Sequence, residues 1–266
     1  MHPIERLRYV ARSHGADAGS LVRETAGALR GLGLDPAGLV VACRRIVERH
    51  PSSGPLWWLC AHVLTSPDPL GTARELALRF DDETLVDVLV ESLPDDATVC
   101  LAGWNDIAGE AVARRGDITV LVIDVDDNAA GLARALHRRG QEAEVVPVAG
   151  AAAAARASDL VLLEAEAAAP DELLAVMGAR PLAAAAYVDQ VPVWALVGTG
   201  RVLPSTLFAA VCERVGDRRV AWDADVEPVP LALVSHVARP DGVIETPPAL
   251  DPECPPAPEL LRVSPM

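Results

Sequence analysis

The chain has 266 residues, of which 51% are hydrophobic, and a formal net charge of −15 from 23 Lys and Arg against 38 Asp and Glu residues. This length and composition predict a globular protein of one or two domains with a sizeable core. The negative charge argues against nucleic acid as a partner, because a phosphate backbone requires a concentrated basic face. The sequence contains no lysine, since all 23 of these basic residues are arginine, so a lysine Schiff base and a P-loop lysine are excluded.

Targeting and metal-binding patterns are not found. No apolar run is long enough to span a bilayer, and the beginning, MHPIERLRYVARS, lacks the apolar core of a signal peptide. We therefore expect a cytoplasmic protein without a membrane partner. The five cysteines form no C-x-x-C pair and the six histidines are scattered, so neither a disulfide framework nor a metal site is expected.

Helical periodicity dominates the first third of the chain and predicts a helical domain over residues 1–93. Two adjacent tryptophans, Trp57 and Trp58, point to different faces of one of its helices. Core filling is the favoured interpretation of this pair, and an exposed interface anchor is the alternative. Helices are expected over 4–11, from Asp17 or Ser20 to Gly31 and Gly33, from Asp35-Pro36, from Leu56, and as a single longer segment over 72–93.

From Thr98 onward, short apolar strands alternate with helices, which predicts right-handed βαβ units and a mostly parallel sheet. The fold class is therefore α/β, with the helical domain over 1–93 followed by a Rossmann-like sheet flanked by helices over 94–222. A proline-rich wrap without long elements is expected over 223–266. Strands are expected over 98–102, 118–125, 144–148, 160–163 and 193–197, and helices over 106–115, 128–139, 151–157, 181–188 and 204–215.

Candidate site residues lie where the expected strands end, and segment 159–204 contributes most of them. In an open α/β sheet, ligands bind at the carboxyl ends of the strands. Each residue alone has an ordinary explanation, such as a turn or a helix cap, whereas their convergence favours a ligand site. Glu166 and Asp126 are the candidates for catalysis. The candidate ligand-binding residues are Gly103, Asn105, Asp124, Glu164, Gly198, Thr199, Gly200 and Arg201.

Three motifs carry a family resemblance. DLVLLEAE, residues 159–166, resembles a typical D-x-V-x-x-G-A-D; VPVW, residues 191–194, is similar to V-P-F-Y; and Gly54-Pro55-Leu56 opens a helix. With the order of strands and helices, these motifs resemble the group of translation initiation factor 2B alpha, beta and delta subunits and the related isomerases of methylthioribose 1-phosphate and ribose 1,5-bisphosphate. The resemblance covers most of the chain and implies a homo-oligomer with a sugar-phosphate or nucleotide-like ligand.

Departures from that family concern the groups that would act on a substrate. The isomerases have a catalytic cysteine just after the first strand, and here that place lies near Gly103, with Cys100 earlier in the strand. The loop that offers the family an arginine is here DVDDN, residues 124–128, which repels a phosphate. The lysine that follows G-A-D is missing, since Met177 to Arg180 stands in its neighbourhood. Glu166 replaces the aspartate of G-A-D and keeps a carboxylate.

Two hypotheses of different class follow. In the first, the protein is a divergent, non-catalytic member of the family that binds a small ligand or regulates as an oligomer. In the second, it is an aldose–ketose isomerase with Glu166 as general base, Asp126 or Asp127 in a polar role and Arg201 as the anion anchor. The missing cysteine, arginine and lysine favour the first. Neither requires a cofactor, and a nicotinamide or flavin enzyme is set aside because no G-x-G-x-x-G follows the first strand.

Overall fold

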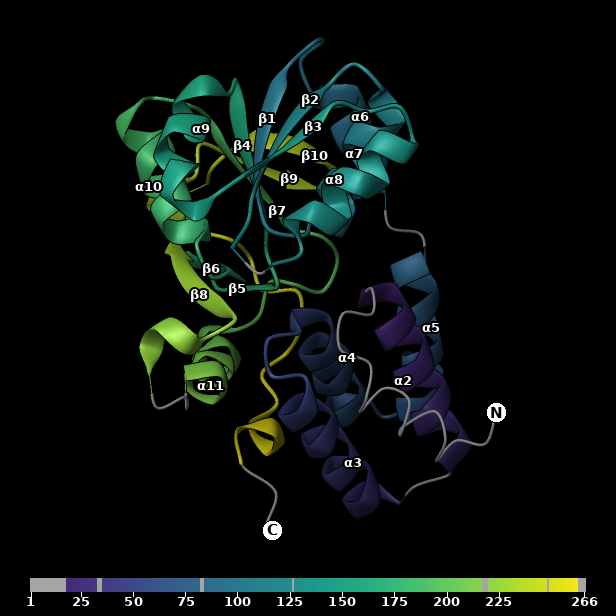
Figure 1. Ribbon diagram of the computed structural model, residues 1–266. Coiled ribbons are helices and arrows are strands. Elements are labelled where there is room, and N and C mark those ends of the chain that lie inside the picture. The colour runs from purple at the N-terminus through teal and green to yellow at the C-terminus, as the bar shows by residue number, and fades with distance from the viewer. Residues whose placement is uncertain are drawn as a thin grey trace.

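The computed structural model describes residues 18–32, 35–81, 84–125, 127–216, 220–247 and 249–262. The helix expected over 4–11 and the cap expected at Asp17 lie outside these residues. Figure 1 shows a group of helices from the first part of the chain beside a sheet that has helices on both of its faces. Within the described residues, no helix is long and apolar enough to cross a membrane.

The helical group is built around α4, which is apolar on all sides. Asp35 caps α3 by accepting a hydrogen bond from the Gly38 N–H at 2.7 Å, as its position before Pro36 suggested. Trp57 and Trp58 of α4 are both fully buried, which confirms the core-filling interpretation of the pair. The helices of the group are α2 (Ala18–Leu32), α3 (Pro36–Arg49), α4 (Gly54–Thr65) and α5 (Pro69–Asp81).

The single amphipathic segment expected over 72–93 is wrong, because α5 ends at Asp81 and a separate helix, α6 (Leu85–Ser92), follows. Leu85 and Leu89 of α6 belong to the hydrophobic cluster of the sheet, whereas α5 packs in the helical group. The Thr84 hydroxyl donates to the Pro240 carbonyl at 2.8 Å and fixes the start of α6 beside the tail. The domain division at residue 93 stays a prediction.

The main sheet has seven strands in the order β10-β9-β7-β4-β1-β2-β3, and all are parallel except β10, which pairs antiparallel with β9. The central strands β1 and β4 are buried on both faces, as expected of a covered parallel sheet. The strands are β1 (Thr98–Ala102), β2 (Thr119–Ile123), β3 (Ala143–Val146), β4 (Leu160–Glu164), β7 (Val193–Leu196), β9 (His236–Arg239) and β10 (Gly242–Glu245).

Helices cover both faces of this sheet, which confirms the expected fold class of a helical part followed by a Rossmann-like sheet. One face packs against α6, α7 (Asp106–Arg115) and α8 (Ala129–Arg138), and the other against α9 (Ala151–Ala157) and α10 (Ala179–Val188). The last helix, α11 (Ser205–Gly216), departs from the pattern. Its Phe208 and Val211 pack in the cluster of the helical group.

A second, three-stranded antiparallel sheet joins the loop after β4 to the tail, in the order β5-β6-β8. Its strands are β5 (Ala167–Ala168), β6 (Glu172–Val176) and β8 (Val226–Pro230). Only a loop was expected between Glu166 and α10, because β5 has two residues and β6 follows Pro170 and Asp171, which are typical of a turn. The proline-rich tail also extends the main sheet with β9 and β10 before it ends in the short 3-10 helix Pro258–Leu261.

Candidate functional site

The carboxyl ends of β7, β4, β1 and β2 are neighbours in the main sheet, so the candidate residues that follow these strands gather at one edge. Gly103 turns the chain after β1 with a φ of +64° and donates its N–H to the Ile123 carbonyl at 2.9 Å. Gly198 and Thr199 are buried in the turn after β7. Open α/β sheets bind ligands at this edge, and for that reason we call it the carboxyl crevice; its described members are residues 103–107, 124–125, 127–128, 164–166 and 198–201.

A buried ion pair joins two strands within the carboxyl crevice. Arg201 is 5% exposed, and its Nη2 lies 3.1 Å from Oε1 of Glu164 at the end of β4. Its Nη1 donates to the carbonyl of Ala165. The guanidinium therefore connects β4 to the turn after β7, and its charge is balanced within the protein before any ligand binds.

Glu164 is the carboxyl group that this environment perturbs most clearly. Burial raises its pKa to about 6, and the carboxylates of Glu166 and Asp106 act in the same direction. Arg201 and the Ile107 N–H, which donates to Oε2 at 3.1 Å from the first turn of α7, favour the charged form and only partly offset burial. A perturbed carboxyl in a crevice is a candidate for proton transfer or for ligand contact.

Three buried polar atoms of the crevice region have no hydrogen-bond partner among the described residues: Nε of Arg201, Oδ1 of Asn105 and Nε1 of Trp58. Asn105 is 4% exposed and donates through Nδ2 to the Ala102 carbonyl at 2.8 Å. Trp58 lies against Gly200, where a Cβ atom would approach its Cδ2 to 2.8 Å. Unsatisfied buried groups are costly, so each of these two donors and one acceptor is a candidate partner for water or for a polar ligand atom.

The acidic loop after β2 serves the local structure. Oδ1 of Asp124 accepts a hydrogen bond from the Ala129 N–H at 3.3 Å and so caps the start of α8. Asp127 has a φ of +60°, in the left-handed region. Asp126, a catalytic candidate, lies outside the described residues, so its role stays a prediction.

The backbone of Glu166 is held from two sides. Its N–H donates to the Leu174 carbonyl of β6 at 2.8 Å, and its carbonyl accepts from the Gly54 N–H at the start of α4 at 2.9 Å. A Cβ at Gly54 would lie 2.8 Å from that same carbonyl oxygen, so this contact requires glycine. The Glu166 side chain is half-buried. Its use as a general base stays a prediction.

Two carboxylates of the tail accept hydrogen bonds from backbone N–H groups near the carboxyl crevice. Oε1 of Glu227 accepts from the N–H groups of Gly178 at 2.6 Å and Arg180 at 3.1 Å, at the start of α10. Glu253 accepts through Oε2 from the Gly200 N–H and through Oε1 from Nη2 of Arg239. Sequence reasoning missed these acidic groups and Arg239, because no motif links the tail to turns so distant in the chain.

Cys100 lies within β1 and not after it. It is fully buried, and burial raises the pKa of its thiol to about 12, against a smaller opposing effect of a hydrogen bond with Ser158. A thiolate is the nucleophilic form of cysteine, so this thiol is inert at neutral pH. Among the described residues, His, Cys, Asp and Glu do not gather in a group of three that could hold a metal ion.

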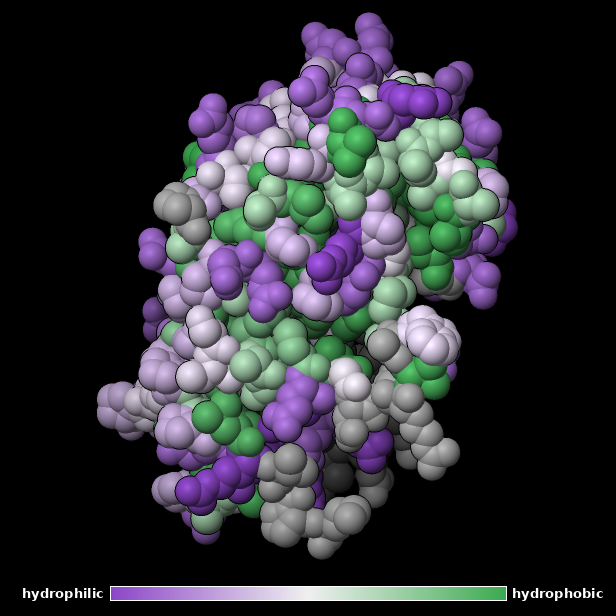
Figure 2. All heavy atoms as spheres, turned by 90° about the vertical axis from the view of Figure 1, so that its left-hand side faces the viewer, coloured by the Kyte–Doolittle hydropathy of each residue, from purple (hydrophilic) through white to green (hydrophobic). Residues whose placement is uncertain are grey.

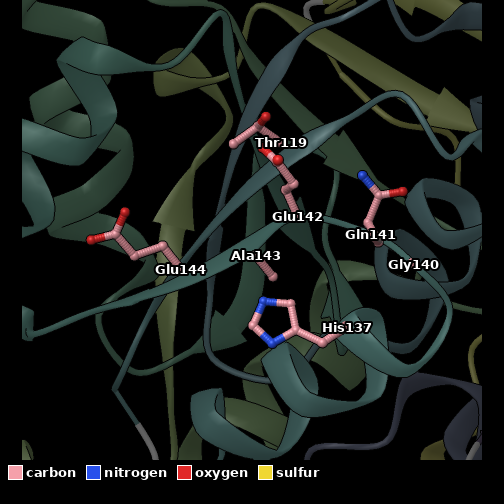
Figure 3. Close-up of a pocket in the computed structure, with 7 residues that line it drawn as sticks. All are labelled: Thr119, His137, Gly140, Gln141, Glu142, Ala143 and Glu144. Carbon is pink, nitrogen blue, oxygen red and sulfur yellow. The ribbon is translucent and has the colours of Figure 1, made fainter.

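Two surface grooves lie at the opposite, amino ends of the strands. The groove in Figure 3 has a volume of about 500 Å³, and its lining includes Thr119, His137, Gln141 and Glu144 from the starts of β2 and β3 and the end of α8. The second groove, of about 540 Å³, lies between residues 187–193 and 232–236 at the starts of β7 and β9. Neither shares a residue with the carboxyl crevice.

Comparison with known proteins relates this chain to a set of solved structures. Translation initiation factor eIF-2B from Pyrococcus horikoshii OT3 has a TM-score of 0.76 and 18% sequence identity over 92% of this chain and 97% of that chain. For eIF2B beta from Chaetomium thermophilum the values are 0.70 and 14%, over 92% and 88%. A tetrameric eIF2B-beta2-delta2 complex from C. thermophilum matches with 0.69 and 16%, over 92% and 90%. The chain matches no model of a known protein family, and no curated protein has a significantly similar sequence.

These likenesses extend over nearly the whole chain, so the protein has the fold of the initiation factor 2B subunits. The fold implied by the motifs at 54–56, 159–166 and 191–194 is thereby confirmed. At identities below one fifth, similarity of fold does not carry activity, ligand or assembly. Function must be inferred from the carboxyl crevice.

Proposed function

We propose that this protein is a divergent, non-catalytic member of the initiation factor 2B subunit-like group, which binds a small polar ligand in the carboxyl crevice and acts as a regulatory, oligomeric protein. The observation that carries the proposal is the state of Arg201. The cation that would anchor a substrate phosphate is instead paired with Glu164 and donates to the Ala165 carbonyl. Releasing it would leave a buried carboxylate without its partner, which is costly.

The neighbouring backbone donors support the same proposal. A helix start that binds phosphate needs free N–H groups, and at α10 those of Gly178 and Arg180 already donate to Glu227. Cys100 is buried in its strand with a raised pKa, so it offers neither a nucleophile nor an acid in the crevice. Arg201 Nε, Trp58 Nε1 and Asn105 Oδ1 are buried polar atoms without a hydrogen-bond partner among the described residues, and hydroxyl or amide groups of a ligand would satisfy them.

The oligomeric part of the proposal rests on exposed apolar surface. Figure 2 views the molecule from the side where Figure 1 shows α9 and α10, and hydrophobic residues form patches there between hydrophilic ones. Tyr187 and Val188 at the end of α10 are 62% and 78% exposed. Both also line the groove of about 540 Å³ together with Val191 and Leu233, and we infer that this continuous apolar surface is where subunits associate. One of the solved structures with this fold is a tetrameric complex.

The alternative is a sugar-phosphate isomerase with Glu166 as general base. It is favoured by one observation, the raised pKa of Glu164, to which Glu166 contributes, because such perturbed carboxyl pairs are common in acid–base sites. In this alternative Arg201 would have to exchange Glu164 for the substrate phosphate.

A ligand panel with a turnover assay separates the two. We expect some sugars or nucleosides to raise the thermal stability of the wild type more than their phosphates do, since a ligand at about a hundred times its Kd adds about 2.7 kcal/mol. No aldose phosphate should be isomerised by the wild type or by Glu166→Gln. Turnover by the wild type that Glu166→Gln abolishes would replace the proposal by the isomerase.

Assembly is tested by sedimentation at micromolar concentration. We expect an oligomer in the wild type that Tyr187→Asp weakens, because a charge in an apolar interface is costly to desolvate. Leu78→Asp is the matched control, since Leu78 is 55% exposed on α5 in the helical group, on an element that packs against α2 and α4 and not against α10. A strictly monomeric wild type would remove the oligomeric part of the proposal.

A further inference from the structure

The tail brings a carboxylate onto the glycine turn that follows β7. One oxygen of Glu253 accepts from the Gly200 N–H and the other from Nη2 of Arg239, at the end of β9. The side chains of Glu253 and Arg239 are 11% and 22% exposed. The two oxygens of one planar group thus meet two donors that come from different parts of the chain, as an ordinary bound carboxylate does.

The backbone on both sides of Glu253 is anchored independently of its carboxylate. The Glu253 N–H donates to the Val202 carbonyl at 2.8 Å, and Nε2 of His62 donates to the Glu253 carbonyl at 3.0 Å. The flanking residues Leu250 and Cys254 are 3% and 7% exposed. Only a rotation of the Glu253 side chain is therefore needed to empty the place of its carboxylate, and the tail can stay bound.

The backbone of both donor residues is held in place without Glu253. Gly200 has a φ of +74°, and a Cβ atom there would lie 2.8 Å from Cδ2 of the buried Trp58, so the backbone of this turn packs closely against the ring. Arg239 belongs to β9, which pairs with β7 in the main sheet. A fixed backbone N–H beside a guanidinium is a combination that recognises carboxylates and other small anions.

We propose that Gly200 and Arg239 form a carboxylate-binding site that Glu253 fills as an internal ligand, and that the carboxylate of an external ligand replaces it. This inference rests on the proposed function, and it adds that the small ligand carries a carboxylate group. The internal occupant itself is planar and singly charged. A phosphate would bring more negative charge next to Asp241, whose Oδ1 lies 4.0 Å from Nε of Arg239.

Titration of Glu253→Ala with acetate, followed by NMR or calorimetry, tests the site. Removal of the internal ligand should raise the affinity for acetate about tenfold to a hundredfold over the wild type, as expected for the loss of a charge-assisted competitor. Glu253→Gln is the matched variant of equal volume: the amide is uncharged and keeps only one acceptor oxygen for the two donors, so the affinity for acetate should rise above that of the wild type and stay below that of Glu253→Ala. Adding Arg239→Ala to Glu253→Ala should abolish the gain.

The acetate titrations test the site at Gly200 and Arg239 whether or not the ligand panel finds a ligand for the carboxyl crevice. An acetate affinity of folded Glu253→Ala no higher than that of the wild type would overturn the inference, as would a gain that survives Arg239→Ala. An equal gain for inorganic phosphate would overturn the assignment to carboxylates. If Glu253→Ala does not fold, NMR of the wild type replaces it: acetate should shift the Gly200 amide resonance in a saturable way that chloride at equal ionic strength does not reproduce, and an unchanged resonance overturns the inference.

Discussion

Replacement of Glu164 by glutamine tests whether burial or the ion pair with Arg201 dominates this carboxyl group. The pKa of Glu164 is raised from 4.5 to about 6 even though Arg201 lies 3.1 Å away. Burial therefore outweighs attraction, and the charged form costs the folded state about 2 kcal/mol at neutral pH, from about 1.4 kcal/mol per unit of pKa. A well-compensated ion pair would have lowered the pKa of this group instead.

The sign of the pH dependence follows from this shift. Between 4.5 and 6 the folded state holds the Glu164 proton and the unfolded state does not, so the contribution of this group to stability is lost as pH rises through that window. Glu164→Gln has no such proton. Relative to the wild type, the variant should gain about 1 kcal/mol between about pH 5 and about pH 7.5. The amide also loses a hydrogen bond to Arg201 or Ile107, but that cost is independent of pH and cancels in the comparison.

Urea unfolding monitored by circular dichroism at both pH values measures the difference. Glu110→Gln is the matched control: the pKa of Glu110 is lowered by hydrogen bonds with Arg139 and Arg114, so both of its states are ionised throughout this range and its difference should stay constant. A constant difference for Glu164→Gln, or a loss of stability as pH rises, would refute the conclusion that burial dominates.

Three further predictions concern single sites. Gly200→Ala should destabilise the protein by about 1–3 kcal/mol in thermal melts, because the new Cβ would lie 2.8 Å from Trp58 at a φ of +74°. Gly116→Ala is the control: its φ is +81° but the space around it is open, so it should cost about 1 kcal/mol. Equal costs for the two variants would show that the contact with Trp58 contributes nothing. The Cys100 thiol, with a pKa of about 12, should react with a thiol reagent at neutral pH only after denaturant is added, and rapid labelling of the native protein would contradict its burial. Asp35→Ala should cost about 1 kcal/mol in urea unfolding through loss of the bond to the Gly38 N–H, and an unchanged midpoint would show that this cap contributes nothing.

Local patterns were sufficient for much of the secondary structure. The strand at Thr98–Ala102 and the helices at Asp106–Arg115 and Ala151–Ala157 have the predicted bounds, because the period of apolar residues changes clearly at their ends. The adjacency of the strand ends also followed from the sequence, since a run of βαβ units brings carboxyl ends to one edge.

Predictions failed where the partner of a segment decides its structure. Residues 85–92 have the same amphipathic pattern whether they continue α5 or form a separate helix. In the structure they form α6, which buries Leu85 and Leu89 against the sheet and not in the helical group. The strands β9 and β10 are four residues each and are stabilised by pairing with β7 and with each other, which proline-rich composition does not reveal.

By itself, the sequence determined the α/β class, the edge at which the candidate residues meet, and the absence of lysine chemistry, because these depend on composition and local periodicity. Only the tertiary structure decided the electrostatic state of that edge. Arg201, in the turn after β7, pairs with Glu164 at the end of β4, and Glu253 of the tail accepts a hydrogen bond from Gly200, which lies 53 positions earlier in the chain. The pKa of a charged group and its availability to a ligand depend on its burial and its partners, and both arise from contacts between segments that are far apart in the chain.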